Sequence, residues 1–246
     1  MKTICIIQAR MGSERLPGKV LKLLNGRPML GHILDRVKMV GAIDSIYVAT
    51  TSLPEDDPIE DLCAAHNVSV YRGSRDDVLS RYYDIAAAEK ADVVVRITGD
   101  CPLVHPQLID TLISFFHEHD YDYVSPRVND EDLIRGLDVE VFSFRSLEKA
   151  YTEGHDPRDR EHVTYFIYSH PHKFKIYKYT VEEIYKCHPE NIRLCVDTPE
   201  DFQLISEIYN HLYRPGDIVD TDAAIAWVRQ SPQLLEINAG IRQKRV

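Results

Sequence analysis

Cysteine, tryptophan and long apolar runs are all scarce in this 246-residue sequence, which has five cysteines and one tryptophan. The cysteine number is odd and no C-x-x-C pair occurs, which argues against a disulfide framework or a thiolate zinc site. No apolar run approaches the roughly 20 residues that a transmembrane helix needs. The apolar run 3–7 near the start is too short for a secretory signal. We therefore expect a cytoplasmic protein without membrane association.

Positive charge is also in the minority, because 29 Lys and Arg face 39 Asp and Glu, for a net charge of −10. Nucleic acids and anionic membranes bind to cationic surfaces, so we expect neither as a partner. A nucleotide pocket stays possible, since it needs only a few local cations. The hydrophobic content of 44% and charged content of 28% are ordinary for a globular protein with a sizeable core.

Short β-branched runs alternate with segments of helical periodicity in the first half of the chain. The predicted strands cover residues 4–7, 45–49, 68–71 and 93–97, and the predicted helices cover 29–40, 58–66, 77–89 and 106–117. This alternation predicts an α/β fold with a mostly parallel, doubly wound sheet in a Rossmann-like three-layer α/β/α architecture.

The second half of the chain is less regular. The predicted strands cover 123–125, 139–144, 173–179 and 193–196, and the predicted helices cover 146–152, 161–169 and 223–229. A further helix should begin at Thr198, which can act as N-cap, with Pro199 at the first helical position and Asp201 three residues after the cap. No linker separates the halves, so we predict one domain over residues 1–246, although the length also permits two small domains.

The first predicted strand is followed by the sequence QARMGSERLPGK, which combines glycines and cations. Ligands of open α/β sheets bind beyond the carboxyl ends of the strands, where this loop lies. Gly12 and Gly18 allow backbone N–H groups to approach a phosphate, and Arg10, Arg15 and Lys19 can neutralise a triphosphate. The loop matches neither the P-loop pattern nor G-x-G-x-x-G, so a kinase or a dehydrogenase is not indicated. A solvated basic loop is the structural alternative.

Two aspartates follow predicted strands at this same edge of the sheet. Asp100 comes after the fourth strand, and Asp197 precedes the Thr198 helix start. Mg²⁺ prefers oxygen ligands and is usually held by one or two carboxylates together with substrate phosphates. The pair therefore suits a magnesium–nucleotide complex, whereas a turn residue and a helix-start residue are the respective alternatives.

Other polar clusters are less suited to a site. Asp120 and Asp122 form a D-x-D sequence, but they precede a strand at its amino end, which indicates a solvated connection. Asp220 to Asp222 should be the N-cap region of the last predicted helix. His170 and His172 lack further ligands at sensible spacing for a metal.

Several sequence blocks occur together in one order over nearly the whole chain. They are IIQARMGSERLPGK, GRPML, YRGSRDDVLSRY, RITGDCPL, GLDVE, REHVT and VDTPED. The set resembles the CMP-sugar synthetases, in particular the branch named for the spore coat polysaccharide biosynthesis protein SpsF, a relative of CMP-KDO synthetase and acylneuraminate cytidylyltransferase. The resemblance implies the nucleotide-diphospho-sugar transferase fold and a Mg²⁺-dependent transfer of CMP from CTP, with release of pyrophosphate.

The resemblance also implies roles for the matching residues. Nucleotide-binding residues would be Ala9, Arg10, Met11, Gly12, Ser13, Arg15, Lys19, Gly73, Ser74, Asp77 and Arg81. Metal ligands would be Asp100 and Asp197, which join Arg10, Arg15 and Lys19 in catalysis. Acceptor-binding residues would be Arg96, Arg135, Gly136, Asp138, Glu140, Glu161 and His162. The nucleotide half would span about 1–120, and the acceptor- and metal-completing half about 121–246.

Some alternatives stay open at this point. Asp77 and Arg81 could form an i,i+4 helix ion pair, Arg96 or Arg135 a surface ion pair, and His162 could be a core histidine. The acceptor would be an acidic sugar or a phosphorylated or phosphonate metabolite for a surface polysaccharide or the cell envelope. A sugar-1-phosphate nucleotidylyltransferase with another NTP, a metal-dependent glycosyltransferase and a non-catalytic nucleotide-binding regulator are the rival functions. A homodimer is expected from the family.

Overall fold

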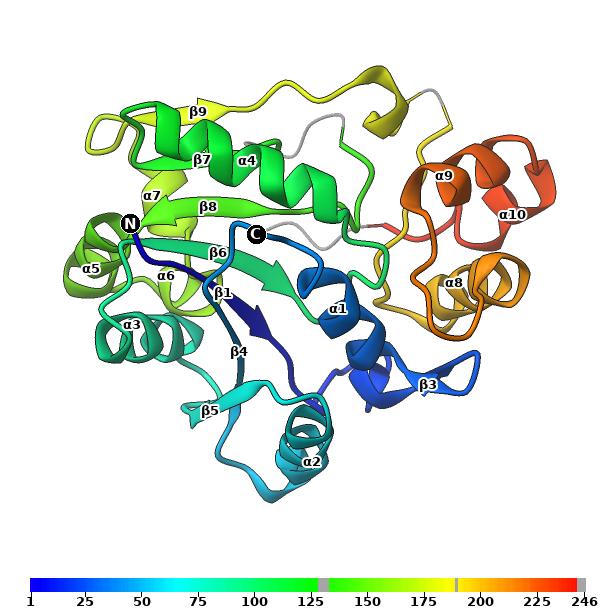
Figure 1. The fold of residues 1–246 in the computed structure, drawn as a ribbon, viewed down its shortest axis with the longest axis horizontal. Helices are drawn as coiled ribbons and strands as arrows, with labels where there is room; N and C mark the ends of the chain where they lie inside the picture. The colour runs from blue at the N-terminus through cyan, green and yellow to red at the C-terminus, as the bar shows by residue number, and fades with distance from the viewer. Residues whose placement is uncertain (128–132, 189, 243–246) are drawn as a thin grey trace.

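The computed structural model describes residues 1–127, 133–188 and 190–242, and within them a seven-stranded sheet forms the centre (Figure 1). The strand order is β5-β4-β1-β6-β8-β7-β9. The strands are β1 (Thr3–Gln8), β4 (Ser45–Thr51), β5 (Ser69–Gly73), β6 (Val93–Thr98), β7 (Tyr123–Ser125), β8 (Glu140–Ser143) and β9 (Ile176–Lys178). A small hairpin, β2 (Leu23–Leu24) with β3 (Arg27–Pro28), lies apart from this sheet.

Four neighbouring strands, β5, β4, β1 and β6, run parallel, whereas β8 is antiparallel to both β6 and β7. Side chains alternate between the two faces of the sheet, so Ile4 and Ile6 join one apolar core while Cys5 and Ile7 join the other. All four are fully buried, as expected when helices cover both faces of a parallel sheet.

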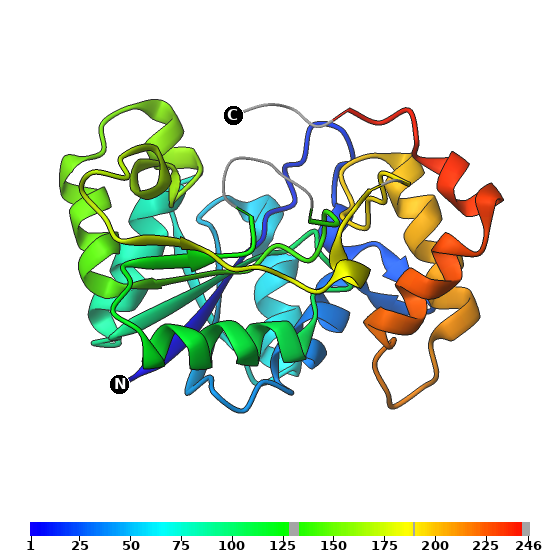
Figure 2. The same ribbon diagram turned by 90° about the horizontal axis from the view of Figure 1, so that it is seen from above.

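The helices divide between these two cores. The core of Cys5 and Ile7 includes buried side chains from α1 (Met29–Val37), α2 (Asp57–Ala65), α4 (Pro106–Glu118), α8 (Pro199–Leu212), α9 (Thr221–Arg229) and α10 (Pro232–Ile237). The opposite core includes side chains from α3 (Val78–Ala88), α5 (Phe144–Glu153) and α7 (Tyr165–Ser169), and the short α6 (Pro157–Glu161) contacts α3. Figure 2 shows α5 and α6 at one end of the molecule and α8 to α10 at the other. Three single-turn 3₁₀ helices, Lys19–Leu21, Pro54–Asp56 and Glu183–Tyr185, complete the described elements.

The predicted α/β class and the mostly parallel sheet are confirmed, and every element predicted in the first half is present within a few residues. The N-cap prediction for α8 is also confirmed: Thr198 accepts from the Asp201 N–H, and Asp201 reciprocates in a capping box. Asp220 likewise caps α9. In the described part of the chain, no helix is long and apolar enough to span a membrane.

Three predictions for the second half are wrong. The helix expected over 161–169 is not continuous: α6 ends at Glu161 and α7 begins at Tyr165. Between them, Val163 has a left-handed φ of 53°, which a right-handed helix does not accommodate. The strand expected over 193–196 is reduced to an isolated bridge between Arg135 and Arg193. The helix α10 follows α9, which was expected to be last.

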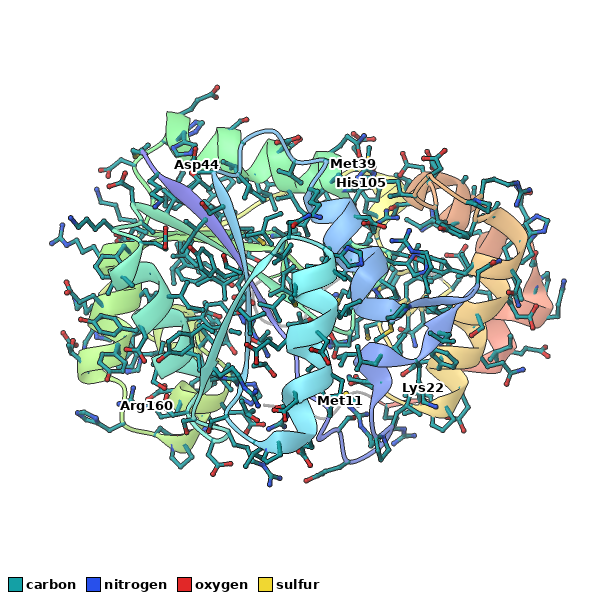
Figure 3. The ribbon with its side chains drawn as sticks, turned by 60° about the horizontal axis from the view of Figure 1, so that its bottom comes forward. Met11, Lys22, Met39, Asp44, His105 and Arg160 are labelled. Atoms are coloured by element: carbon teal, nitrogen blue, oxygen red, sulfur yellow. The ribbon has the colours of Figure 1, made fainter. Side chains whose placement is uncertain are left out.

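The carboxyl ends of the parallel strands lie at one edge of the sheet. Figure 3 shows Met11, which follows β1, at this edge, with Asp44, which precedes β4, at the opposite one. At this edge the loop after β1 contacts the segment after β4, through a hydrogen bond from the Met11 N–H to Asp56.

Candidate active site

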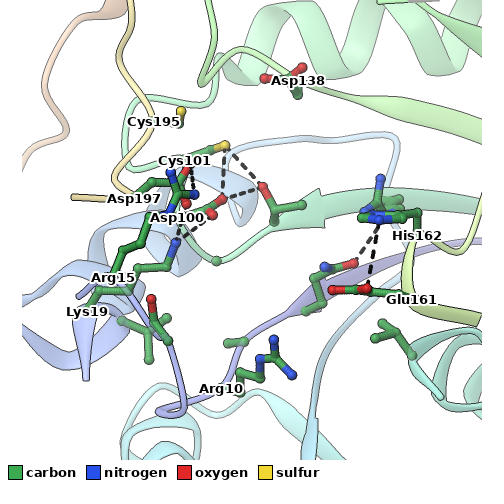
Figure 4. A pocket seen from close by; sticks show the side chains of 18 of the residues that line it. Arg10, Arg15, Lys19, Asp100, Cys101, Asp138, Glu161, His162, Cys195 and Asp197 are labelled. Carbon is green, nitrogen blue, oxygen red and sulfur yellow. Dashed lines mark hydrogen bonds and ion pairs between the residues drawn. The ribbon is translucent and has the colours of Figure 1, made fainter. Parts of the chain in front are cut away.

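A cavity of about 570 Å³ opens at the carboxyl edge of the sheet (Figure 4). Many predicted site residues line it: Ala9, Arg10, Ser13, Arg15, Lys19, Arg81, Arg96, Asp100, Arg135, Asp138, Glu140, Glu161, His162 and Asp197. They come from the loop after β1, from α3, from β6 and its following loop, from the segment before β8, and from residues 161–162 and 197. Parts of the chain far apart in sequence therefore meet at one cavity.

Lys19 lies between the two predicted metal ligands. Its Nζ donates to Asp100 Oδ2 at 2.8 Å, to Asp197 Oδ1 at 2.9 Å and to the Val196 carbonyl oxygen at 2.7 Å. The Lys19 side chain is only 12% exposed, so these interactions act in a partly desolvated environment. The two carboxylates thus converge on one cationic position, and Figure 4 shows them together with Arg15 at one end of the cavity.

Asp100 is partly buried, and it is ionised at neutral pH. Burial alone would raise its pKa, but the Lys19 ammonium and hydrogen bonds from Thr98 and Cys101 lower that pKa to about 2. Thr98 Oγ1 donates to Asp100 Oδ1 at 2.6 Å, which leaves Oδ2 directed at Lys19. The side chain is therefore a charged carboxylate held in a fixed orientation.

The donor set suits a hard divalent cation. Carboxylate and carbonyl oxygens surround the Lys19 ammonium, and these are the ligand types that Mg²⁺ prefers. Among the described residues, no group of three or more His, Cys, Asp or Glu side chains could hold a metal by itself. Two carboxylates with room for other ligands fit Mg²⁺, which usually completes its coordination with water and phosphate oxygens.

Arg81 also lines the cavity, and its guanidinium is buried with almost no compensation. The residue is 2% exposed, its Nη1 donates to the Ala49 carbonyl at 3.0 Å, and its Nε has no acceptor. Burial lowers the pKa of Arg81. By contrast, buried Arg36 donates to two carbonyls and to Thr221 Oγ1. Within the described ranges Arg10 makes no side-chain hydrogen bond or ion pair, so two arginines here have donors to offer a ligand.

The other end of the cavity contains a closed ion-pair network. Arg96 on β6 faces Glu140 on β8, with Nη1 2.7 Å from Glu140 Oε1, and its Nε donates to Gln8 Oε1 at 3.1 Å. Thr164 Oγ1 donates to the second Glu140 oxygen at 2.6 Å. The charge of Arg96 is therefore already compensated by the partly buried Glu140. The alternative of an ion pair holds for Arg96, although the pair lies in the cavity lining rather than on the open surface.

Several predicted nucleotide- or acceptor-binding residues do not line the cavity: Met11, Gly12, Gly73, Ser74, Asp77 and Gly136. For two of them, the structure shows a local structural role. The Met11 N–H donates to Asp56 at 2.6 Å, and Asp77 caps α3 by accepting from the Ser80 N–H at 2.8 Å. Asp77 lies 3.7 Å from Arg160, and no ion pair with Arg81 is formed. Their contact with a ligand stays a prediction.

Other lining residues were not singled out from the sequence, namely Gln8, Glu14, Val20, Val78, Thr98, Gly99, Cys101 and Cys195. Most are direct neighbours of predicted residues in the same motifs, and this adjacency could have identified them from the sequence. Arg193 is a different case, because it lies behind Asp197 rather than in the cavity lining, four residues earlier in the chain. Asp120 is exposed and pairs with Lys175, in agreement with a solvated connection.

Comparison with known proteins adds family information to this geometry. The cytidylyltransferase family matches residues 4–222 of the chain. An uncharacterised protein of Methanocaldococcus jannaschii is 42% identical over 246 residues, covering 99% of this chain and 97% of that protein. The spore coat polysaccharide biosynthesis protein SpsF of Bacillus subtilis is 33% identical over 228 residues, covering 89% of this chain and 90% of SpsF.

A solved structure agrees over the entire chain. A cytidylyltransferase from Leptospira borgpetersenii serovar Hardjo-bovis superposes with a TM-score of 0.88 at 29% identity, covering 100% of this chain and 99% of that one. The second half, where several predicted elements were wrong, is thus part of the shared fold.

Proposed function

The chain belongs to the cytidylyltransferase family, and on that premise we propose that it transfers CMP from CTP to an acidic sugar or a phosphorylated or phosphonate acceptor. The observation that carries the proposal is the convergence of Asp100 and Asp197 on the cationic position that Lys19 occupies, at the carboxyl edge of the sheet. Nucleotidyl transfer requires such a place, where negative charge from the protein and the triphosphate is neutralised by cations.

The nucleotide would lie along the loop after β1. Arg15 and Lys19 are placed to neutralise the triphosphate, and Arg10 has no other partner among the described side chains. The buried donors of Arg81 lie beside Ala9, because the Ala49 carbonyl accepts from both residues. Arg81 would therefore hydrogen-bond acceptor atoms of the nucleotide that enter this part of the cavity.

The proposal includes Mg²⁺ held by Asp100 and Asp197. When bound, the ion would supply further neutralisation of the phosphate charge. The ionised state of Asp100, with its pKa lowered to about 2, keeps one ligand ready throughout the neutral range. Lys19 has the reach to exchange its carboxylate contacts for phosphate oxygens, because its ammonium is a flexible point charge.

Other residues of the cavity lining would bind the acceptor. Arg135 and His162 can donate to an anionic group, while Asp138 and Glu161 can accept from hydroxyl groups. The SpsF relative is named for spore coat polysaccharide biosynthesis, which supports a sugar acceptor for a surface polysaccharide or the cell envelope.

The proposed reaction uses this arrangement. An oxygen of the acceptor attacks the α-phosphorus of CTP, the bond from that phosphorus to the bridging oxygen of the β-phosphate breaks, and pyrophosphate leaves. Where the attacking group is a hydroxyl, its proton is released to water. The protein contributes position and charge, and no covalent enzyme intermediate is needed. The expected cytoplasmic location and the homodimer are parts of this proposal that stay predictions.

The test is pyrophosphate release from each of the four NTPs with Mg²⁺, against a panel of acidic sugars, sugar phosphates and phosphonates. We expect release with CTP and one acceptor class. Release with UTP, GTP or ATP and a sugar 1-phosphate would instead establish the sugar-1-phosphate nucleotidylyltransferase. Transfer of sugar from a nucleotide sugar, with no pyrophosphate formed, would establish a glycosyltransferase.

A further inference from the structure

Asp197 is held by two arginines on one of its oxygens and by Lys19 on the other. Arg193 Nη2 lies 2.6 Å from Asp197 Oδ2, and Arg15 Nη2 lies 3.1 Å from the same oxygen. Oδ1 is the oxygen that faces Lys19, at 2.9 Å, next to Asp100. The two oxygens therefore have different environments, and the Arg193 contact helps to decide which one points into the cavity.

Arg193 is itself fixed by a second carboxylate. Its Nε donates to Asp201 Oδ1 at 2.9 Å, and Arg193 and Asp201 are 6% and 0% exposed. The Asp201 Oδ2 also accepts from the backbone N–H groups of Asp197 and Thr198. The start of α8, Arg193 and the Asp197 backbone thus form one connected unit, and a guanidinium fork bridges its two carboxylates.

The segment after α10 closes this unit from behind. Asn238 Nδ2 donates to Asp201 Oδ1 at 2.9 Å and to the Arg193 carbonyl at 3.1 Å, and the residue is 6% exposed. A side chain more than 40 residues after Asp197 in sequence therefore fixes the orientation of the residue that holds Asp197. Side chains that do not touch a metal but hold its coordinating residues in orientation commonly change the affinity of the site for that metal.

We infer that Arg193 is a positioning residue for nucleotidyl transfer. It holds Asp197 Oδ2 so that Oδ1 faces the cation position beside Asp100, and Asp201 and Asn238 hold Arg193 in turn. This inference rests on the proposed function, because it assigns Asp197 to a divalent cation. Arg193 touches neither the nucleotide nor the acceptor in this arrangement.

The test uses Arg193→Lys, which keeps the charge but loses the fork, with Arg229→Lys as the matched control. Arg229 also lies in the C-terminal part and pairs with a carboxylate, Glu190, at 3.6 Å, but it contacts neither Asp197 nor Asp201. Three quantities are measured for each protein: the Mg²⁺ dependence of pyrophosphate release, Mn²⁺ binding by electron paramagnetic resonance with CTP present, and CTP binding in EDTA.

For Arg193→Lys we expect the half-saturating Mg²⁺ concentration and the Mn²⁺ dissociation constant to rise about 10- to 100-fold. Turnover at saturating Mg²⁺ and CTP affinity in EDTA should stay near wild type, because the catalytic groups remain. The control should match wild type in all three. Unchanged metal dependence in folded Arg193→Lys would overturn the inference, and so would an equal loss of CTP affinity in EDTA, which indicates direct nucleotide contact.

Asn238→Ala provides a second test that leaves both ion pairs of Arg193 in place. We expect the half-saturating Mg²⁺ concentration and the Mn²⁺ dissociation constant to rise, but less than in Arg193→Lys. If neither rises in the folded protein, this would contradict the inference that Asn238 helps to hold Arg193. A failure of the proposed function is distinguishable from these outcomes, since the wild-type protein would then release no pyrophosphate from CTP with any acceptor, whereas Mn²⁺ binding and CTP binding in EDTA would still compare the variants with wild type.

Discussion

Asp100 is partly buried and ionised, and its charge is balanced by Lys19 alone among the described cations that contact it. Asp100→Asn keeps the side-chain shape and can retain the Thr98 contact, so the fold should persist. Turnover should fall about 10²- to 10³-fold or more, the usual effect of removing one preorganised charge contact. Pyrophosphate release measures turnover, and circular dichroism checks the fold.

Asp120→Asn is the control for that experiment, because Asp120 is exposed and pairs only with Lys175 in the described chain. It should leave turnover unchanged. Turnover of Asp100→Asn at the level of this control would remove Asp100 from the mechanism.

The same side chain makes a prediction about acid stability. The pKa of Asp100 is lowered from 3.8 to about 2, so its ionised form stabilises the folded state above pH 3.8, and this contribution is lost as the pH falls toward 2. The difference in unfolding free energy between wild type and Asp100→Asn should therefore shrink by about 2 kcal/mol over that range. Urea unfolding at a series of pH values measures it. A difference that is constant with pH would contradict the lowered pKa.

Arg81 offers a test in which stability and binding change in opposite directions. Arg81→Met removes a buried charge that has one acceptor, so the ligand-free protein should gain roughly 1 kcal/mol in unfolding free energy. CTP affinity should fall about 10- to 100-fold, because charged hydrogen bonds contribute about 1.5–3 kcal/mol. Thermal unfolding and isothermal titration calorimetry measure the two effects.

Arg36→Met is the matched control, since Arg36 is equally buried but donates to three acceptors outside the cavity. It should lower stability, because those acceptors lose their donor. Unchanged CTP affinity in folded Arg81→Met would show that the buried arginine is structural.

The sequence pattern predicts correctly where a residue lies when its position follows from a strand end. Asp100 and the cations after β1 could be placed because parallel strands end at one edge of the sheet. The pairing of Arg96 with Glu140 and of Arg193 with Asp197 and Asp201 could not be predicted. These pairs depend on which strands neighbour each other and on how the α8 segment docks, which no local pattern contains.

At the scale of elements, the strands and helices of the first half agree with those predicted from the sequence, because each is long, regular and bounded by polar residues. The second half departs from its pattern where tertiary contacts override local preference. Val163 is fully buried in a left-handed conformation, so its packing interrupts the helix that periodicity predicted. Residues 193–196 are stabilised by one bridge to the segment before β8 rather than by a full ladder.

That bridge depends on Gly136, which has a φ of 105° and whose added Cβ would lie 2.6 Å from the Leu194 carbonyl carbon. Gly136→Ala should cost at least about 1–2 kcal/mol from backbone strain alone, with a further cost from the contact. Displacement of the neighbouring Arg135 and Asp138 should also reduce turnover. Urea unfolding and pyrophosphate release measure the two effects.

Gly216→Ala separates strain from contact, because Gly216 has a φ of 88° but a Cβ there would meet nothing within 4 Å. It should lose stability from strain and keep full turnover. Equal effects of the two substitutions on both readouts would show that the close approach of Gly136 to Leu194 is unimportant.

At the scale of the whole molecule, the cavity is lined from both halves of the chain, from Gln8 to Asp197. A ligand that fills it should stabilise the folded protein as one unit. CTP with Mg²⁺ at 100 times its dissociation constant should add about 2.7 kcal/mol to the unfolding free energy. Differential scanning fluorimetry with the four NTPs measures this, and CTP should give the largest rise in Tm. Equal rises with all four would argue against selection of the cytosine base.

The antiparallel direction of β8 has a consequence for how the family can diversify. Because β8 starts where β6 ends, its cavity residues precede the strand and form one short stretch from Arg135 to Glu140, whereas the phosphate-facing cations and aspartates come from distant loops. Inherited changes in this one stretch would therefore act on its cavity residues as a group. They would reach Arg96 through Glu140 and Asp197 through the bridge from Arg135 to Arg193.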